Sequence, residues 1–178
     1  MRKAILLTAL LLSAPLPALA QLRTAPNYSY IDAGWLQSEP DDADKENGGF
    51  LGGSFGVGER FHVFGEYADA GPLTIWEAGG GWHGLFGDKL DLVLEGSIVD
   101  FEIEDGWKIS VGLRWMITQR MELNGFLSHQ EFGDSDDQPL EANFIWNFAR
   151  SFAVGGGVVS GDEFDWVRAF ARFNFGNR

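Results

Sequence analysis

Apolar and polar residues alternate along most of the chain. In 107–115 (WKISVGLRW), Ile109, Val111 and Leu113 form an apolar row that a tryptophan closes at each end, and two cations lie on the opposite face. Alternation with period two is typical of β-strands whose two faces meet different surroundings. The pattern recurs at 27–37, 48–58, 61–69, 74–84, 89–100, 120–131, 139–148, 151–160 and 164–175, although the faces of 151–160 are ambiguous.

Ten strands of about ten residues, with no helix among them, predict an all-β fold. We expect a single closed antiparallel transmembrane β-barrel with an up-and-down meander, with eight strands as the alternative to ten. An even number of strands places both ends of the barrel domain on the same side.

The connections between the predicted strands are of two kinds that alternate strictly. Acidic loops follow the odd-numbered strands: SEPDDADKEN, DAGPL, FEIEDG, FGDSDDQP and SGDEFD. Tight turns that each contain a cation follow the even-numbered ones, around GER, FGDK, TQR and ARS. Outer-membrane barrels have the same asymmetry, with short periplasmic turns and longer outer loops.

The tryptophans indicate which face contacts lipid. Trp107 and Trp115 are separated by roughly 20 Å along the membrane normal, at ~3.3 Å per residue and a ~40° tilt, close to the ~25 Å apolar band of such barrels. Other aromatics near strand ends are Trp35, Tyr67, Trp76, Trp82, Trp146 and Trp166, of which only Trp166 falls on the inward face. A soluble barrel with an apolar interior is the alternative. Its outer surface would then be the face rich in glycine and serine, and such small residues suit a crowded barrel interior better than a solvent-exposed surface.

Charged residues concentrate on the predicted inward face. They are Asp32, Glu66, Glu77, Asp91, Glu95, Glu122 and Glu141, with Lys108, Arg114, Arg168 and Arg172. Buried charges are costly unless paired, so we expect an ion-pair network that fills the lumen and leaves no open diffusion pore. A narrow ion path or a catalytic cluster remains the alternative for these charges.

Residues 1–20 have the features of a secretory signal peptide. Arg2 and Lys3 precede an apolar run, and Ala18-Leu19-Ala20 forms a small-residue cleavage site. The barrel domain is then 21–178, in the outer membrane, and loss of the two cations lowers its formal charge from −13 to −15. This acidity disfavours nucleic-acid binding, and the absence of cysteine means that no disulfide contributes to stability.

No residues form a recognisable catalytic site. Ser128, His129 and Glu131 at the outer rim are the most suggestive group, but adjacent serine and histidine point to opposite faces of a strand. His62 and His83 are expected at the periplasmic ends of their strands. We therefore predict no enzymatic activity, no catalytic residues and no cofactor.

The acidic loops do not match a calcium-binding motif. The stretch DDADKENGG departs from EF-hand spacing, and no bidentate glutamate follows in register. Solvated loops are expected and no metal site is assigned. A weaker hypothesis is that divalent cations bridge loop carboxylates to lipopolysaccharide phosphates through Asp41, Asp42, Asp44, Asp134, Asp136 and Asp137.

Three stretches together resemble a known family. NYSYIDAGW, the GER turn leading into FHVFGEYAD, and AGGGWHGLFGDKLDLV are similar to the small outer-membrane barrels called sulfation-dependent quorum factors, or diffusible-signal-regulated outer-membrane proteins. The resemblance covers nearly the whole of 21–178. It implies a ten-stranded outer-membrane barrel linked to signalling, motility and biofilm behaviour, and it supplies no catalytic residues. A sulfated tyrosine was proposed for that family; we interpret Tyr28 and Tyr30 here as strand residues.

The leading hypothesis is a monomeric, non-enzymatic outer-membrane barrel that acts in envelope structure, surface interaction or signalling-related behaviour through its acidic loops. A narrow channel or small-ligand transporter is the alternative, followed by a lipid-modifying enzyme and a secreted ligand-binding barrel. The expected partners are outer-membrane lipid, lipopolysaccharide and the barrel-assembly machinery. That machinery usually recognises a terminal aromatic, and here Gly176-Asn177-Arg178 follow Phe175; because the last strand is intact, we expect assembly to be preserved.

Overall fold

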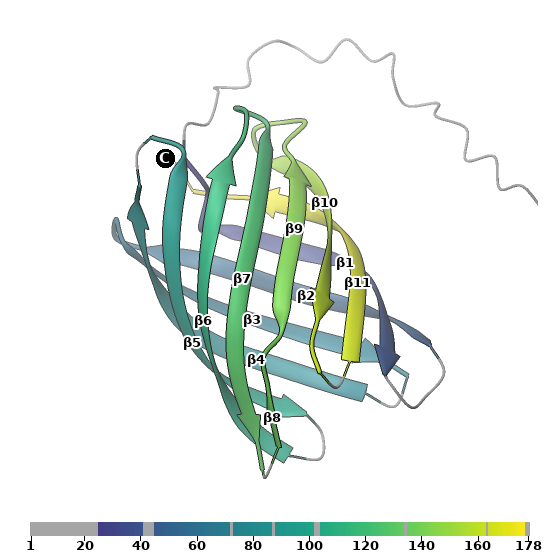
Figure 1. The fold of residues 1–178 in the computed structure, drawn as a ribbon. Helices are drawn as coiled ribbons and strands as arrows, with labels where there is room; N and C mark the ends of the chain where they lie inside the picture. The colour runs from purple at the N-terminus through teal and green to yellow at the C-terminus, as the bar shows by residue number, and fades with distance from the viewer. Residues whose placement is uncertain are drawn as a thin grey trace, which may run out of the picture.

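A computed structural model shows that the chain forms one closed antiparallel β-barrel (Figure 1). The structure describes residues 25–40, 45–71, 73–86, 88–101, 104–133, 135–162 and 164–176, so the predicted signal peptide lies outside the described residues. The strands are β1 (Tyr30–Pro40), β2 (Glu46–Val57), β3 (Phe61–Ala70), β4 (Leu73–Leu85), β5 (Leu90–Phe101), β6 (Glu104–Met116), β7 (Met121–Phe132), β8 (Ser135–Asp137), β9 (Leu140–Trp146), β10 (Phe152–Ser160) and β11 (Phe164–Asn174). In this described part of the chain, no helix is long and apolar enough to cross a membrane.

Ten long strands close the barrel, as predicted. Each pairs with its sequence neighbours, and β1 pairs with β11 from Tyr30 opposite Asn174 to Pro40 opposite Phe164. The three-residue β8 is the exception, because it pairs only with the last three residues of β7, while β9 pairs with the earlier part of that strand. This closure leaves no long unpaired strand edge, which is what a spanning sheet requires in lipid.

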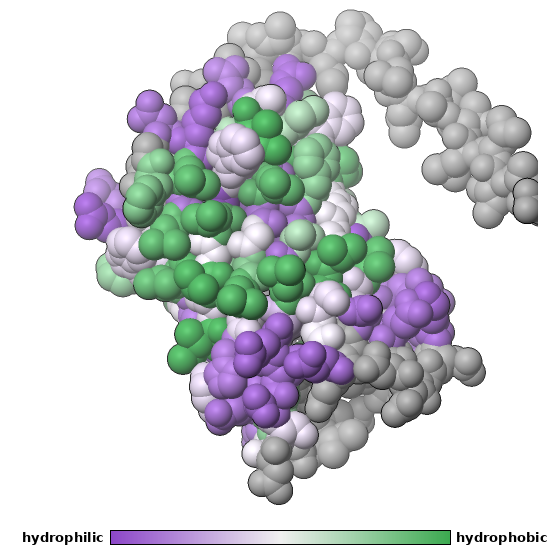
Figure 2. Space-filling view, in the orientation of Figure 1, coloured by the Kyte–Doolittle hydropathy of each residue, from purple (hydrophilic) through white to green (hydrophobic). Residues whose placement is uncertain are grey.

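The apolar rows predicted from the alternation face outward. Ile98 on β5 and Ile109 on β6 are each 58% exposed. Figure 2 shows hydrophobic residues in a band across the visible face, with hydrophilic residues on both sides of it. The ambiguous strand β10 follows the same rule, with Val154 and Val158 exposed and Ala153 buried. An exposed apolar belt on a closed barrel is the surface of a transmembrane barrel.

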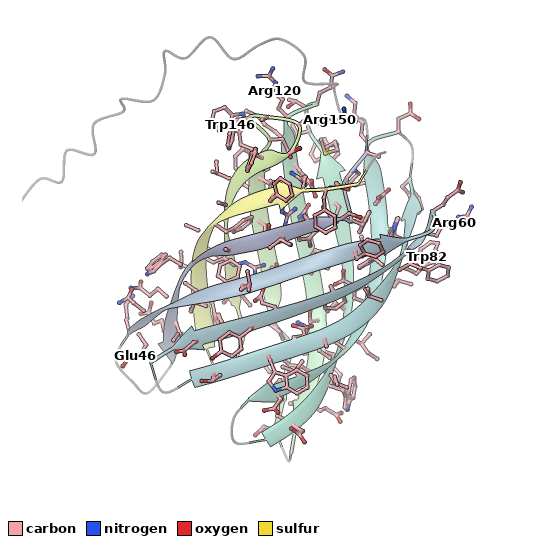
Figure 3. The ribbon with its side chains drawn as sticks, turned by 180° about the vertical axis from the view of Figure 1, so that it is seen from behind. Glu46, Arg60, Trp82, Arg120, Trp146 and Arg150 are labelled. Atoms are coloured by element: carbon pink, nitrogen blue, oxygen red, sulfur yellow. The ribbon has the colours of Figure 1, made fainter. Side chains whose placement is uncertain are left out.

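The two ends of the barrel differ in charge, as the connections predicted. Figure 3 shows Arg60, Arg120 and Arg150 at the turn end and Glu46 at the other, loop end. Gly58 lies in the first turn with a φ of 68°, a conformation that favours glycine. The exposed Tyr67, Trp76 and Trp107 lie near the loop ends of their strands, the exposed Trp115 and Trp146 lie near the turn ends, and Trp35 lies at the middle of β1. Aromatic girdles of this kind mark both borders of the apolar band.

The first strand begins later than predicted, because residues 25–29 do not join the sheet. The interpretation of Tyr28 as a strand residue is therefore wrong, whereas Tyr30 does start β1. Tyr28 is only 2% exposed, and its ring stacks on His83 with centroids 3.6 Å apart. Burial of this large ring inside the barrel mouth outweighs the hydrogen bonds that a longer β1 would gain.

Candidate functional site

The lumen contains the predicted ion-pair network. Near the turn end, Arg172 donates two hydrogen bonds to Asp32, at 2.7 and 2.6 Å, in a bidentate pair. Arg114 donates from Nε to Glu122 Oε1 at 2.8 Å, and both side chains are almost fully buried. These charges lie within hydrogen-bond distance of opposite charges, which offsets the cost of removing them from water.

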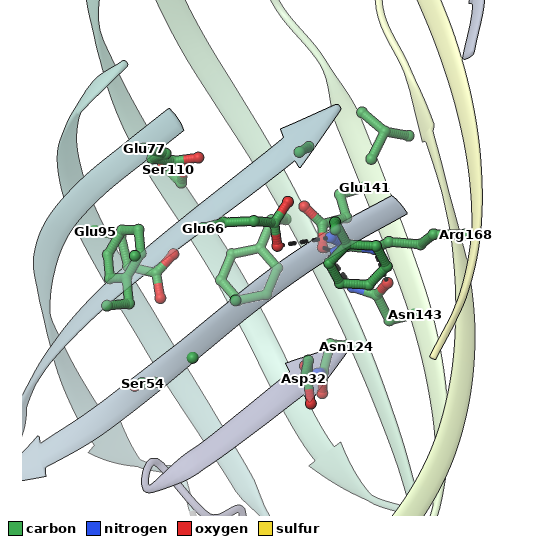
Figure 4. Close-up of a pocket in the computed structure, with 18 of the residues that line it drawn as sticks. Asp32, Ser54, Glu66, Glu77, Glu95, Ser110, Asn124, Glu141, Asn143 and Arg168 are labelled. Carbon is green, nitrogen blue, oxygen red and sulfur yellow. Dashed lines mark hydrogen bonds and ion pairs between the residues drawn. The ribbon is translucent and has the colours of Figure 1, made fainter. Parts of the chain in front are cut away.

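A second group of ion pairs lies further toward the loop end (Figure 4). Glu77 accepts from Lys108 Nζ at 2.5 Å and from Ser97 Oγ at 2.6 Å. Arg168 pairs closely with Glu141 and reaches Glu66 Oε2 at 3.4 Å. One guanidinium therefore serves two carboxylates, and the contact with Glu66 is the weaker of the two.

The small residues on the inward face make room for rings, as the crowded-interior argument predicted. A Cβ atom added to Gly112 would lie 2.2 Å from the ring of Phe126, and one added to Gly81 would lie 2.4 Å from the ring of His62. At Gly52, the nearest atom would be Glu66 Oε2 at 3.0 Å. These glycines let large inward side chains lie against the barrel wall.

The segment 25–29 lies in the turn end of the lumen, where Tyr28 is buried. We call this segment the plug. Tyr28 donates to Asp91 Oδ2 at 2.9 Å, and the Arg114 guanidinium lies 4.4 Å from the centre of its ring. Burial raises the pKa of the Tyr28 phenol, so the hydroxyl keeps its proton and remains a donor. Arg114 Nη2 also donates to the backbone oxygen of Asn27 at 3.1 Å. The plug is thereby fixed to β5 and β6.

A cavity of about 210 Å³ lies inside the barrel. Its lining runs from Tyr28 and Arg114 at the turn end to Val99, Gln130 and Pro139 near the loop end. The charged part of the wall is formed by Asp32, Glu66, Glu77, Glu95, Glu141, Lys108, Arg168 and Arg172, with Arg114 at the plug. The ion pairs therefore do not fill the lumen completely.

The residues considered for catalysis are not brought together. Ser128 faces the lumen, where its Oγ lies 2.8 Å from Ser110 Oγ. His129 lies on the outer face, with its ring edge-on to Trp107, and its Nε2 is 3.5 Å from Glu131. His62 and His83 lie buried at the turn end, as predicted. The suggestive group at the rim is thus divided between the two faces of β7.

The acidic loops show no metal site in the part of the chain that the structure describes. Asp41, Asp42, Asp44 and Asp134 lie outside the described residues. Asp137 is buried and accepts from the backbone nitrogens of Gln138 and Asp162 and from the Gln130 amide, so its carboxylate fastens the loop. No group of three possible metal ligands occurs among the described residues.

Sequence reasoning missed the plug and the unequal pairing of the carboxylates. The alternation in NYSYIDAGW is equally compatible with a strand that begins at Asn27. The one available signal was the presence of Asp91 and His83 on inward faces near the same end, where a tyrosine finds both a hydrogen-bond acceptor and a ring.

The closed ladder, the exposed apolar belt and the charged lumen define an outer-membrane β-barrel, and the protein is located in the outer membrane. Its fold is similar to the solved NanC porin, with a TM-score of 0.59 and 6% identity over 82% of this chain and 100% of that one. The KdgM porin matches with a TM-score of 0.56 and 11% identity over 83% and 99% of the two chains. An outer-membrane channel from Pseudomonas putida F1 matches with a TM-score of 0.56 and 8% identity over 87% and 98%. No family model and no curated protein matches the chain.

Proposed function

We propose that the protein is a non-enzymatic outer-membrane barrel with a lumen closed at its turn end, which acts in the envelope through its loop end and its cavity. The observation that carries this proposal is the plug. Tyr28 is held by stacking on His83, by a hydrogen bond to Asp91 and by the guanidinium of Arg114. A continuous aqueous path would have to break these contacts, each of which is buried.

Further contacts support a firmly held plug. Asn27 Nδ2 donates to Asn174 Oδ1 at 3.1 Å, and the backbone nitrogen of Phe175 donates to the oxygen of Ser29 at 2.9 Å. The plug is thus tied to the last strand as well as to β5 and β6. Several anchors on different strands favour a static closure over a loose segment.

Conductance in planar bilayers tests this function. The folded protein is expected to give no discrete conductance steps, whereas Tyr28→Ala, which removes the ring, is expected to give them. Tyr28→Phe is the matched control: it keeps the stack and loses only the hydrogen bond to Asp91, so it should stay closed. Steps of equal size in the unaltered protein and in Tyr28→Ala would contradict the proposal.

A narrow channel or small-ligand transporter is the second candidate. The cavity of about 210 Å³ and the likeness of the fold to porins favour it. A solved complex of the KdgM porin contains oligogalacturonate, an acidic sugar chain. For the present chain, the carboxylates in the lumen argue against an anionic substrate, so a channel here would prefer cations. Cation-selective steps in the unaltered protein would favour this candidate.

The absence of enzymatic activity and the family membership are part of the same proposal. The separation of Ser128 from His129 supports the first, and lipid A mass analysis with and without the protein tests it. The three stretches that resemble the quorum-factor family support the second. Loss of motility or biofilm formation in a deletion strain, restored by the intact chain, is the expected result if the family role applies.

The proposed partners are outer-membrane lipid, lipopolysaccharide and the barrel-assembly machinery. We propose that the barrel itself is a monomer. The continuous apolar belt supports lipid contact on every side. Calorimetry tests the weaker loop hypothesis: the absence of calcium and magnesium binding in the millimolar range would remove a cation bridge to lipopolysaccharide.

A further inference from the structure

Beyond the two ion pairs at the turn end, the cavity has more carboxylates than cations. Four carboxylates (Glu66, Glu77, Glu95 and Glu141) and two cations (Lys108 and Arg168) line this part, which leaves a formal charge of −2 with neutral histidine. The other lumenal pairs, Arg114 with Glu122 and Arg172 with Asp32, each cancel within themselves. An enclosed surplus of negative charge attracts a cation.

The surplus is located on two residues. Glu95 has one partner, His62 Nε2 at 2.9 Å from its Oε1. Glu66 has only the long contact of 3.4 Å to Arg168. Within the described part of the chain, the second oxygen of each carboxylate accepts no hydrogen bond, so each residue can still bind a donor.

Two buried polar groups in the same cavity wall point independently to a ligand. Ser54 is 5% exposed and its Oγ has no hydrogen-bond partner among the described residues. His62 is 3% exposed, and its Nδ1 likewise has no partner there. Both residues line the cavity, and Figure 4 shows Ser54 on its wall with Glu66 and Glu95. Buried polar atoms are normally satisfied, so unsatisfied ones in residues that line a cavity point to a place where a polar ligand is accommodated.

Aromatic rings complete the wall. Phe64 and Phe126 both line the cavity, and each ring lies close to an inward glycine, Gly79 and Gly112 respectively. The face of an aromatic ring attracts an ammonium group. The Arg172 guanidinium already covers the ring of Tyr30 at 3.6 Å, and Arg168 and Arg172 also lie within about 6 Å of the rings of Phe50 and Phe170. Phe64 and Phe126 are therefore the rings that we assign to a ligand.

We propose that the cavity binds a small organic cation with one or two ammonium groups, held by Glu66 and Glu95 and by Ser54 Oγ. The proposal rests on the lumen being closed at the plug, as in the proposed function, because a ligand then enters and leaves from the loop end. The cavity of about 210 Å³ is many times the roughly 10–15 Å³ that one water needs on the same measure, so a short diamine fits. A bare metal ion is disfavoured, since no group of three ligands occurs among the described residues.

Calorimetry with putrescine, a four-carbon diamine, tests the proposal on the full barrel folded in detergent micelles. Putrescine is expected to bind, whereas butanediol of the same length and the dianion succinate are not. Glu66→Gln and Glu95→Gln are each expected to weaken binding by about tenfold or more, because each removes a charge-assisted hydrogen bond. Ser54→Ala is expected to weaken it by about threefold. Glu131→Gln, an exposed carboxylate near the loop end and outside the cavity wall, is the matched control and should bind as the unaltered protein does.

The outcomes separate this site from the closed lumen. Equal binding of putrescine and butanediol, or equal losses in Glu66→Gln and Glu131→Gln, would overturn the site. A heat-modifiable gel shift shows which variants fold; if Glu66→Gln does not, the diamine and diol comparison on the unaltered protein decides. Conductance steps together with specific putrescine binding would overturn the plug and keep the site, whereas a closed barrel that does not bind putrescine would overturn the site alone.

Discussion

The two halves of the lumen are built from the same alternating strands and differ in how their charges are paired. At the turn end, the side chains of Arg114 and Glu122 are 4% and 2% exposed, and the plug covers them. Further into the lumen, those of Glu66 and Glu95, near the middle of β3 and β5, are 35% and 21% exposed and have one partner each. Alternation thus decides that a charge faces inward. The tertiary arrangement around the plug decides whether that charge is neutralised or left available to solvent and ligand.

The largest expected effect is the loss of a pair beneath the plug. Arg114→Met leaves Glu122 buried without its ion partner, and breaking a buried pair in this way costs about 3–5 kcal/mol. In micelles, the variant should unfold at a much lower urea concentration than the unaltered protein, with unfolding measured by tryptophan fluorescence. Arg120→Met, in an exposed turn, is the control and should unfold with the unaltered protein. A similar loss of stability in both variants would contradict the claim that the buried ion pair stabilises the turn-side half of the lumen.

An arginine placed on the outer face of the barrel tests whether that face lies in the apolar part of the membrane. Val111 is exposed near the middle of β6, and Val111→Arg places a guanidinium in the apolar belt at a cost of about 2–4 kcal/mol. Asp105→Arg, near the loop end of the same strand, should cost within about 1 kcal/mol because the border of the membrane is polar. Folding equilibria in lipid vesicles measure both, and equal costs at the two positions would contradict an apolar belt across β6.

A smaller effect is expected from the corresponding pair in the loop-side half. Lys108→Met leaves Glu77 with Ser97, and both members of the ion pair border the cavity, where water reaches them. We expect a loss of about 1 kcal/mol, as for partly solvated pairs. The same urea measurement in micelles applies. If this loss matched that of Arg114→Met, the two halves would be equivalent and the proposed difference between them would fail.

The period-two pattern predicted most of the fold. It located all ten barrel strands, the acidic and basic ends, the inward charges and even the inward position of Trp166, which is partly buried against the interior apolar cluster. These features depend only on which side of a strand a residue lies, and sequence position determines that. The ambiguity of 151–160 arose because glycine at 155–157 shows no preference for either face.

The candidate site was predicted only in part. The inward carboxylates and cations were identified, but not which of them pair. Tyr28 contacts Asp91 and His83, which lie more than fifty positions later in the chain. Such contacts depend on the register of the strands around the whole barrel. The surplus likewise follows from partners on different strands: Arg168 lies between Glu66 and Glu141, and Glu95 contacts only His62. No local pattern carries this information.

The orientation of the two faces is the claim on which every other conclusion depends, and the tryptophans allow it to be measured directly. Two single-tryptophan barrels, one with only Trp107 and one with only Trp166, are folded into vesicles whose acyl chains carry bromine, a contact quencher of indole fluorescence. Trp107 is exposed on the outer belt, whereas Trp166 lines the cavity. The structure predicts strong quenching of Trp107 and little of Trp166; strong quenching of Trp166 with Trp107 unaffected would show that the charged face, not the apolar one, meets the lipid.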